Sequence, residues 1–226
     1  MHIPDGFIDG PTSVAGGAVA VAGLAVCIKK ASDTMEDKQI PLAGLTAAFV
    51  FAVQMLNFPV ATGTSGHLLG GVLAAVLVGP WVGTLCVSVV LTVQCLLFAD
   101  GGVSALGLNI INMAMVGAFG GYAVFLVIKK LAPRTRGGVT TAAGIAAGLA
   151  PPLAALVFTF EYAIGGNGAA SVGTVAAAMV GVHILIGIGE GVITAMAVGS
   201  VLAVRPDLVW GARELNRHPV VQAAVA

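Results

Sequence analysis

The chain has 226 residues, of which 58% are hydrophobic and 9% are charged, and its formal net charge is zero. Soluble domains carry roughly 25% charged residues, so the composition excludes a soluble globular protein and predicts a polytopic membrane protein. The balanced charge gives no indication of nucleic acid binding.

The first six residues read Met-His-Ile-Pro-Asp-Gly, and this start is a metal chelate in itself. The Met1 amine, the deprotonated amide of His2 and the His2 Nδ1 can close two fused rings around one ion. Three coplanar nitrogens suit Ni(II), Cu(II) or low-spin Co(II) better than tetrahedral zinc. We expect Met1 to be retained, because methionine removal generally needs a small second residue. An accidental Met-His start is the alternative interpretation of these residues.

Seven segments are candidates to cross a bilayer, which requires about 20 mostly apolar residues. They are residues 11–29, 40–57, 66–80, 81–99, 104–128, 138–160 and 172–204. Only Gly79-Pro80-Trp81 separates the third from the fourth, and the Pro151-Pro152 pair should kink the sixth. Three pairs of small residues four apart predict close helix contacts. These pairs are Gly117/Gly121, Gly144/Gly148 and Gly187/Gly191.

With seven spans, every Lys and Arg residue falls on the same side of the membrane. They are Lys29, Lys30, Lys38, Lys129, Lys130, Arg134, Arg136, Arg205, Arg213 and Arg217. The positive-inside rule makes that side cytoplasmic and places the N-terminus outside. We therefore expect a single all-α transmembrane domain over residues 1–226. It would consist of a chelating segment (1–10), a bundle of about seven helices (11–204) and a cytoplasmic tail (205–226).

The opposite side carries two histidines and four acids, and no Lys or Arg. These residues are His2, His67, Asp5, Asp9, Asp100 and Glu161. Either Thr64 or Ser65 can act as the N-cap of the third span, which would place His67 in its first turn. The helix dipole would then keep the His67 ring neutral, the form that binds metal. His2 and His67 together would complete a set of four nitrogens, although His67 taken alone fits a polar anchor at the interface.

Several other polar residues lie close enough to take part in such a site. Asn57 and Ser65 are expected to hold the loop that presents His67, with Thr64 and Asp100 as further supports. Asp5 or Asp9 could offset part of the charge of the ion. The remaining polar residues lie within the apolar spans and are expected to join helices. They are Gln54, Gln94, Asn109 and Asn112.

The last span contains two ionisable residues, His183 and Glu190, which are seven apart and share a helix face. Ionisable groups inside a span indicate function by default. An interhelical hydrogen bond that only fixes packing is the alternative. The three cysteines, Cys27, Cys86 and Cys95, lie in apolar runs and fit small packing residues.

These motifs together resemble the CbiM/NikM family, the substrate-binding membrane components of energy-coupling-factor transporters for cobalt and nickel. The similarity runs from residue 1 to about residue 204. Besides the start of the chain, it rests on four motifs: residues 57–71 around Gly63-Thr-Ser-Gly-His, residues 79–81, residues 94–102 ending in Asp100-Gly-Gly, and residues 183–191. The resemblance implies that the Met1 amine, the His2 amide and ring, and His67 are the metal ligands.

The resemblance also implies a role, partners and a location. The chain would bind Co(II) or Ni(II) on the outer face and deliver the ion across the cytoplasmic membrane of a prokaryote. Its partners would be a transmembrane coupling (T) subunit, cytoplasmic ATPase subunits and often a small accessory membrane subunit. The chain has no Gly-x-x-x-x-Gly-Lys-[Ser/Thr] motif, so we expect a transporter subunit that is not itself an enzyme. The length, without a fused extension after Arg205, slightly favours cobalt and cobalamin biosynthesis.

Two other classes of protein are possible alternatives. A secondary transporter driven by an ion gradient would need a coupling-ion pathway and usually internal repeats, and Glu190 is the only acid deep in a span. An intramembrane serine hydrolase could use Ser65 and His183, but the chain lacks a Gly-x-Ser-x-Gly elbow at Ser65 and an acid to orient the histidine.

Overall fold

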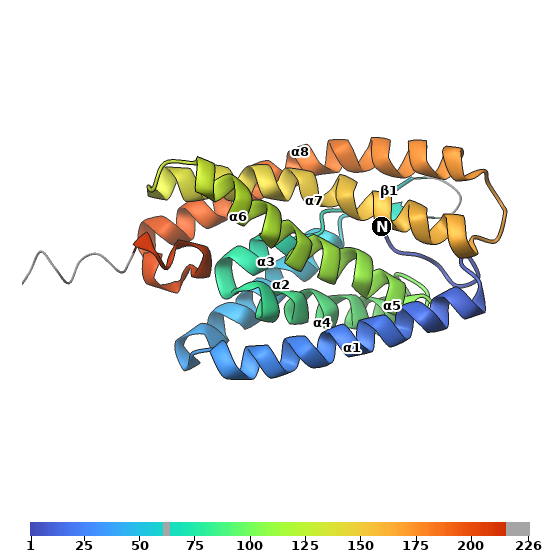
Figure 1. Cartoon of the computed structure of the whole chain (residues 1–226), viewed down its shortest axis with the longest axis horizontal. Coiled ribbons are helices and arrows are strands. Elements are labelled where there is room, and N and C mark those ends of the chain that lie inside the picture. The colour runs from blue at the N-terminus through green and yellow to red at the C-terminus, as the bar shows by residue number, and fades with distance from the viewer. Residues whose placement is uncertain (61–63, 216–226) are drawn as a thin grey trace, which may run out of the picture.

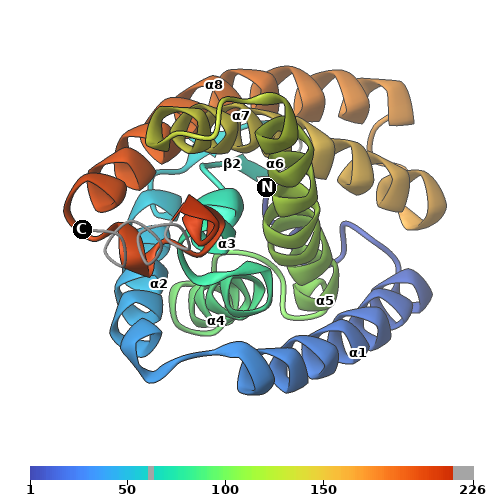
Figure 2. The same cartoon turned by 60° about the vertical axis from the view of Figure 1, so that its left-hand side comes forward.

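Long helices make up most of the computed structural model, which describes residues 1–60 and 64–215 (Figures 1 and 2). The helices are α1 (Gly10–Thr34), α2 (Ile40–Gln54), α3 (Gly71–Val78), α4 (Pro80–Phe98), α5 (Leu106–Asn109), the π-helix η2 (Ile110–Gly120), α6 (Gly121–Leu131), α7 (Arg136–Gly165) and α8 (Val172–Val204). The short elements are the 3₁₀-helices η1 (Asp37–Gln39), η3 (Pro206–Leu208) and η4 (Trp210–Ala212), and the antiparallel strands β1 (Phe58–Pro59) and β2 (Ser65–Gly66).

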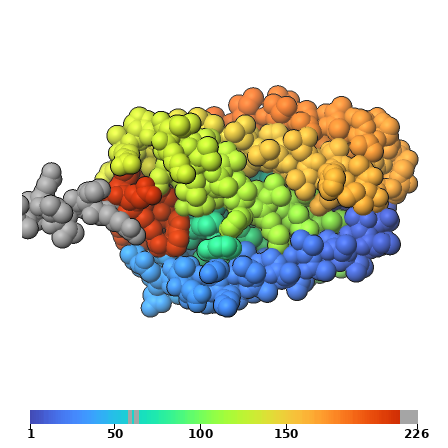
Figure 3. Space-filling view, in the orientation of Figure 1, coloured from blue at the N-terminus to red at the C-terminus, as the bar shows by residue number. Residues whose placement is uncertain are grey.

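Five helical runs in the described part of the chain are long and apolar enough to cross a membrane. They are Gly10–Thr34, Pro80–Phe98, Leu106–Leu131, Arg136–Gly165 and Val172–Val204. The predicted class, an all-α membrane protein, is confirmed. Helices α1 and α8 lie along the two long flanks of the molecule, with the segment that contains η2 and α6 between them (Figure 3).

The third predicted span, residues 66–80, is wrong as a continuous helix. Only α3 is helical there, and its eight residues extend about 12 Å at 1.5 Å per residue. The described residues before it include the strands β1 and β2, and Gly70 enters the helix with a left-handed φ of 70°. The predicted N-cap at Thr64 or Ser65 is also wrong, because Ser65 lies in β2 and Gly70 caps the helix.

Helix α3 lies in the middle of the bundle, where it contacts α2, α4, η2 and α7 (Figure 2). All eight of its residues are buried. Gly71 allows a close approach, because a Cβ at this position would lie 2.5 Å from the carbonyl carbon of Gly117. Non-helical backbone at membrane depth is tolerated where protein covers it, and this central position provides that cover for the loop and for α3.

The predicted contacts between small residues are confirmed in the hairpin of α7 and α8. A Cβ at Gly191 would lie 2.8 Å from the carbonyl oxygen of Gly144, and a Cβ at Gly144 would lie 3.0 Å from that of Gly191. The two backbones therefore approach each other as closely as glycine allows. Helix α7 continues through Pro151 and Pro152 as one helix.

The connecting segments gather at two ends of the molecule (Figure 1). At one end, Lys129 Nζ donates to the carbonyl of Gly211 at 2.9 Å, and Arg213 donates to Glu36 at 3.2 Å. These bonds join the end of α6 and the linker after α1 to the segment after α8. At the opposite end, Asp9 N donates to Gly165 O at 2.7 Å, which joins the N-terminal segment to the connection between α7 and α8.

Candidate metal centre

The N-terminal segment runs back from α1 into the interior of the bundle, where Met1 is fully buried. The next residues are held along the loop that follows α4. Ile3 N donates to Asn109 Oδ1 at 2.8 Å, and Ile3 O accepts from Gly102 N at 2.8 Å. Asp5 Oδ1 accepts from the backbone N and the hydroxyl of Ser104 at 2.8 and 2.6 Å. The chain start is therefore a packed and hydrogen-bonded element.

The structure brings His2 and His67 into contact, although they are 65 positions apart in the sequence. Their ring centroids lie 4.7 Å apart with an interplanar angle of 33°. His2 is 4% exposed and His67 is fully buried. The amide N–H of Ile3 donates to Asn109 Oδ1 and is therefore already bonded. The amide of His2 is the backbone nitrogen beside the rings that remains for an ion.

Burial keeps the three candidate donors uncharged, and all three lie outside the membrane-spanning helices. It lowers the pKa of the Met1 amine to about 4, against the charge of Asp100, which raises it. Burial and then the charge of the amine lower the pKa of His2 to about 3. The same two causes, in that order, hold the pKa of His67 well below its usual value. Each group therefore carries a free lone pair at neutral pH, as metal binding requires. The predicted cause for His67, a helix N-terminus, is wrong.

The polar neighbours of the two rings indicate which ring nitrogen of each histidine is free. His67 Nδ1 lies 2.8 Å from the carbonyl of Leu68, which can only accept, so Nδ1 carries the proton and Nε2 carries the lone pair. That Nε2 is buried without a hydrogen-bond partner. His2 Nε2 lies 3.6 Å from Asp100 Oδ2. That distance is longer than a hydrogen bond, and His2 Nε2 has no hydrogen-bond partner. The negative charge of the carboxylate still favours the proton on Nε2, which leaves the lone pair on Nδ1, the atom that the chelate needs.

Glycine is required beside the His2 ring. Gly101 has a φ of +91°, and a Cβ there would lie 2.9 Å from His2 Nδ1 and 3.0 Å from Asn109 Nδ2. Any larger residue would be strained by its backbone and would occupy the space beside the donor atom. The sequence offered a signal for this, the Asp100-Gly101-Gly102 motif, but gave no indication that it faces His2.

Three of the residues that were expected to support the site, Asn57, Thr64 and Ser65, make different kinds of contact. Asn57 Nδ2 donates to Asp100 Oδ2 at 2.8 Å, so Asn57 positions the carboxylate beside His2. Thr64 Oγ1 lies 3.7 Å from Met179 Sδ, and Ser65 pairs with Pro59 through the backbone of β2.

Other predicted residues lie at the edge of the centre or away from it. The backbone carbonyl of Gln94 accepts from Asp100 N at 3.1 Å, and the Gln94 side chain is buried. Asp5 bonds Ser104, as described above. Asp9 caps α1 by accepting from Thr12 N at 2.8 Å. Glu161 accepts from Asn112 at 2.7 Å.

Glu190 and Gln54 hold the segment that directly follows His67. The two carboxylate oxygens of Glu190 accept from Leu69 N at 2.6 Å and from Gly70 N at 2.9 Å. Gln54 Nε2 donates to Leu69 O at 2.6 Å. Buried backbone groups need partners, and these side chains supply them where the backbone is not helical. Both residues stand out in the sequence as polar groups within apolar segments, but nothing in the sequence indicates that they bond the same segment.

The described residues contain no group of three or more His, Cys, Asp or Glu side chains that could hold a metal. Two imidazoles are the side-chain donors at this centre, so further ligands for an ion would have to come from the backbone at the chain start. Cys27, Cys86 and Cys95 are buried free thiols, as expected for packing residues.

The chain is similar to known metal transport proteins over most of its length. A family model described as "Cobalt uptake substrate-specific transmembrane region" matches residues 2–208. A protein of Archaeoglobus fulgidus, named provisionally as a fused nickel transport protein NikMN, is 41% identical over 92% of this chain and 68% of its own length. The "Cobalt transport protein CbiM" of Sorangium cellulosum is 36% identical over 99% of this chain and 98% of its own. The crystal structure of a truncated transition metal transporter superposes with a TM-score of 0.83 at 31% identity, covering 90% of this chain and 99% of that one.

Proposed function

Because the chain belongs to the CbiM family, whose members include cobalt and nickel transport proteins, we propose that it is the substrate-binding subunit of an energy-coupling-factor importer. In this role it binds Co(II) or Ni(II) on the outer face of a prokaryotic cytoplasmic membrane. The ion is the substrate of the protein. The family model matches nearly the whole chain, and this extent of the match supports assigning the role of the family to the chain.

The proposed ligands are the Met1 amine, the deprotonated amide of His2, His2 Nδ1 and His67 Nε2. The observation that carries this proposal is the contact between the His2 and His67 rings beside a buried amine. Four nitrogens of this kind favour a planar Ni(II) or low-spin Co(II) ion. The Asp100 carboxylate lies 3.6 Å from His2 Nε2 and is held by Asn57, so its negative charge favours the proton on that nitrogen.

We further propose that the chain crosses the membrane seven times, with the N-terminus outside and the C-terminus in the cytoplasm. The segment that directly precedes α3 counts together with α3 as one of these crossings. The basic segments at one end of the molecule support this orientation through the positive-inside rule. The chain start joins the connection between α7 and α8 at the other end, where an ion would arrive.

Transport by this subunit requires a transmembrane coupling subunit and cytoplasmic ATPase subunits, with a small accessory membrane subunit as a further partner. Cobalt is the slightly favoured ion. A secondary transporter would need a free acid for ion coupling. In this protein both oxygens of Glu190 hold backbone N–H groups, which favours a structural role for that acid.

The experiment that tests the proposal compares His67→Ala with His218→Ala in the purified protein with its native N-terminus. His218 lies outside the described residues and in the expected cytoplasmic tail. Calorimetric titration with Ni(II) and Co(II) should show a sharp loss of affinity for the His67 variant only. Uptake of the ion into cells should depend on coexpressed coupling and ATPase subunits. Equal affinities for the two variants, or uptake by the chain alone that follows the proton gradient, would refute the proposal.

A further inference from the structure

His183 on α8 is a fully buried imidazole that the proposed four-nitrogen site does not use. Its Nδ1 lies 2.7 Å from the backbone carbonyl of Met179, one turn earlier in the helix. A carbonyl can only accept, so Nδ1 carries the proton and Nε2 carries the lone pair. That Nε2 is inaccessible and has no hydrogen-bond partner. A buried acceptor without a partner is costly and needs an explanation, such as an ion that binds there.

His67 has the same arrangement, with Nδ1 held by a backbone carbonyl and Nε2 buried without a partner. In both residues the backbone fixes the tautomer in which the far nitrogen can bind metal. The two imidazoles come from different parts of the chain, the loop before α3 and the middle of α8. Two imidazoles in the described part of the chain are therefore held in a state that can bind a metal ion.

Helix α8 packs around His183 against the residues that lead into His67. Thr64 Oγ1 lies 3.7 Å from Met179 Sδ, one turn before His183. A Cβ at Gly66 would lie 2.9 Å from Ile186 Cδ1 and 3.5 Å from Val182 Cγ1. His183 therefore lies on α8 between side chains that contact the loop directly before His67.

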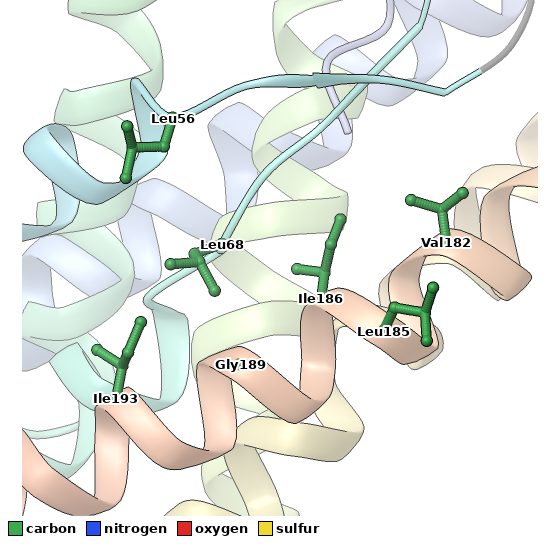
Figure 4. A pocket seen from close by; sticks show the side chains of 7 residues that line it. All are labelled: Leu56, Leu68, Val182, Leu185, Ile186, Gly189 and Ile193. Atoms are coloured by element: carbon green, nitrogen blue, oxygen red, sulfur yellow. The ribbon is translucent and has the colours of Figure 1, made fainter.

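An apolar groove of about 440 Å³ lies between this stretch of α8 and Leu68, lined also by Val182, Ile186 and further apolar residues (Figure 4). These lining residues offer no side-chain ligand for an ion. His183 is an ionisable residue within a helix that is long and apolar enough to cross a membrane, and such residues often mark the path of an ion.

We propose that His183 Nε2 is a fifth nitrogen donor that bonds the metal while the ion enters or leaves the four-nitrogen site. This inference rests on the proposed function. A planar four-coordinate ion exchanges ligands by an associative route, in which an incoming donor bonds before an existing bond breaks. His183 Nε2 supplies the incoming lone pair. The bond from the ion to the His2 amide nitrogen then breaks, and that nitrogen takes up one proton from water. The oxidation state of the metal does not change, and the His183 proton stays on Nδ1.

A donor of this kind acts on the rate of exchange more than on the affinity. A permanent fifth bond would disturb the planar arrangement, so His183 must be free of the ion in the resting complex. Removing its lone pair should therefore slow both loading and release. A residue with only a packing role would behave in the opposite way, because its removal would loosen the site and speed release.

The test uses the full chain with its native N-terminus, loaded with Ni(II) and mixed with excess chelator in a stopped-flow spectrometer. His183→Leu replaces the imidazole by an apolar side chain of similar size and removes the lone pair. We expect the planar Ni(II) absorption of this variant to decay about tenfold more slowly than that of the unmodified protein. The equilibrium affinity should stay within about twofold, which is a small fraction of the free energy of one ligand bond.

Thr194→Ala is the matched control, because Thr194 is a buried polar residue on the same helix and no role in binding is assigned to it. Its release rate should equal that of the unmodified protein. Unchanged or faster release from the His183→Leu variant overturns the inference, as does loss of binding in that variant. If the unmodified protein itself gives no planar Ni(II) signal, the proposed four-nitrogen site fails, which is a distinguishable result.

Discussion

The residue that decides the chemistry of the proposed site is the first one, because it contributes through its free amine. Its side chain is buried among apolar residues of the core, so the packing of Met1 also holds the amine in place. His2 adds a ring and an amide at the next position. Two of the four proposed donors are therefore backbone atoms, and a search for clusters of metal-binding side chains does not find them.

A single residue added before Met1 should abolish binding of Ni(II) and Co(II). The added residue converts the amine into an amide and moves the charged terminus into a space where Met1 is fully buried. Calorimetric titration of the extended protein should show no measurable heat of binding, while circular dichroism should show the same helix content. A protein that carries a tag at the C-terminus is the control and should bind normally. An unchanged affinity in the extended protein would rule out the amine as a ligand.

The pH dependence of binding should reflect a single proton. The pKa of the Met1 amine is lowered to about 4 and that of His2 to about 3, and the pKa of His67 is also lowered. These groups are already neutral between about pH 6 and pH 8, so binding does not displace protons from them. The amide of His2 is the one proposed donor that must lose a proton. Affinity should therefore rise about tenfold for each pH unit over this range.

Titrations in two buffers with different ionisation enthalpies measure the number of protons released per ion. We expect a value of about one, the amide proton. A value of zero, with an affinity that does not change with pH, would exclude coordination by the amide. A value of two or more would show that the amine or an imidazole is charged before the ion binds.

At the scale of secondary structure elements, the decisive feature is the non-helical segment between α2 and α3. It allows His67 to approach the chain start, and it leaves backbone groups that need partners inside the bundle. Glu190 and Gln54 provide those partners at Leu69 and Gly70. Glu190 thus links the longest helix of the bundle to the loop of a proposed ligand.

Replacing Glu190 by Gln should weaken metal binding by about 10–100-fold, the usual effect of losing a group that orients a ligand. In the Gln side chain an amide NH2 group replaces one of the two carboxylate oxygens, and it would face one of the backbone N–H groups of Leu69 and Gly70 without accepting from it. The loop would hold His67 less firmly, while the chelate formed by Met1 and His2 would stay intact. Calorimetric titration with Ni(II) measures the loss.

Glu161→Gln is the control for this substitution. Glu161 is a buried acid as well, but it bonds Asn112 at 2.7 Å and does not touch the loop. A Gln at this position can still bond an amide, so the affinity should stay close to that of the unmodified protein. Equal losses in the two variants would show that any buried acid supports the fold, and that Glu190 has no particular link to His67.

Much of the helical layout could be predicted from the sequence, because long apolar runs with turn residues between them identify α1, α4, α7 and α8. The exception is the segment at residues 66–80. Its apolar residues are typical of a span, and hydropathy does not distinguish a buried loop with a short helix from a transmembrane helix. The loop exists because Glu190, more than a hundred residues later, satisfies its backbone, and such a tertiary partner has no local signal.

In the candidate site, too, local sequence features could be predicted and tertiary contacts could not. The Met-His start and His67 could be picked out from local chemistry and from the resemblance to a family. The roles of Asn109, which holds Ile3, and of Gly101, which leaves room beside His2, depend on how distant segments meet. The sequence predicts a neutral His67 from a helix N-terminus. In the structure His67 is neutral because it is buried, and this burial depends on the non-helical backbone that the sequence does not reveal.

At the scale of the whole molecule, the two ends differ in charge and in construction. One end gathers the basic residues near η4, where Lys129 and Arg213 bond the segments around them. The other end joins the chain start to the connection between α7 and α8 through bonds at Asp9 and Asn167. An ion that approaches this second end meets no fixed positive charge in the described residues of the connecting segments, so the field favours a cation there.

The proposed orientation predicts which residues a reagent outside the cell can reach. Ala169→Cys places a thiol on the exposed connection between α7 and α8, and Asp33→Cys places one near the exposed end of α1. A maleimide that does not cross membranes should label the first variant in intact cells and the second only after lysis, because the positive-inside rule puts the basic end in the cytoplasm. The native thiols Cys27, Cys86 and Cys95 are buried and should contribute little background. Labelling of Asp33→Cys but not of Ala169→Cys in intact cells would invert the topology, and the metal would then bind on the cytoplasmic side, which is incompatible with uptake from outside.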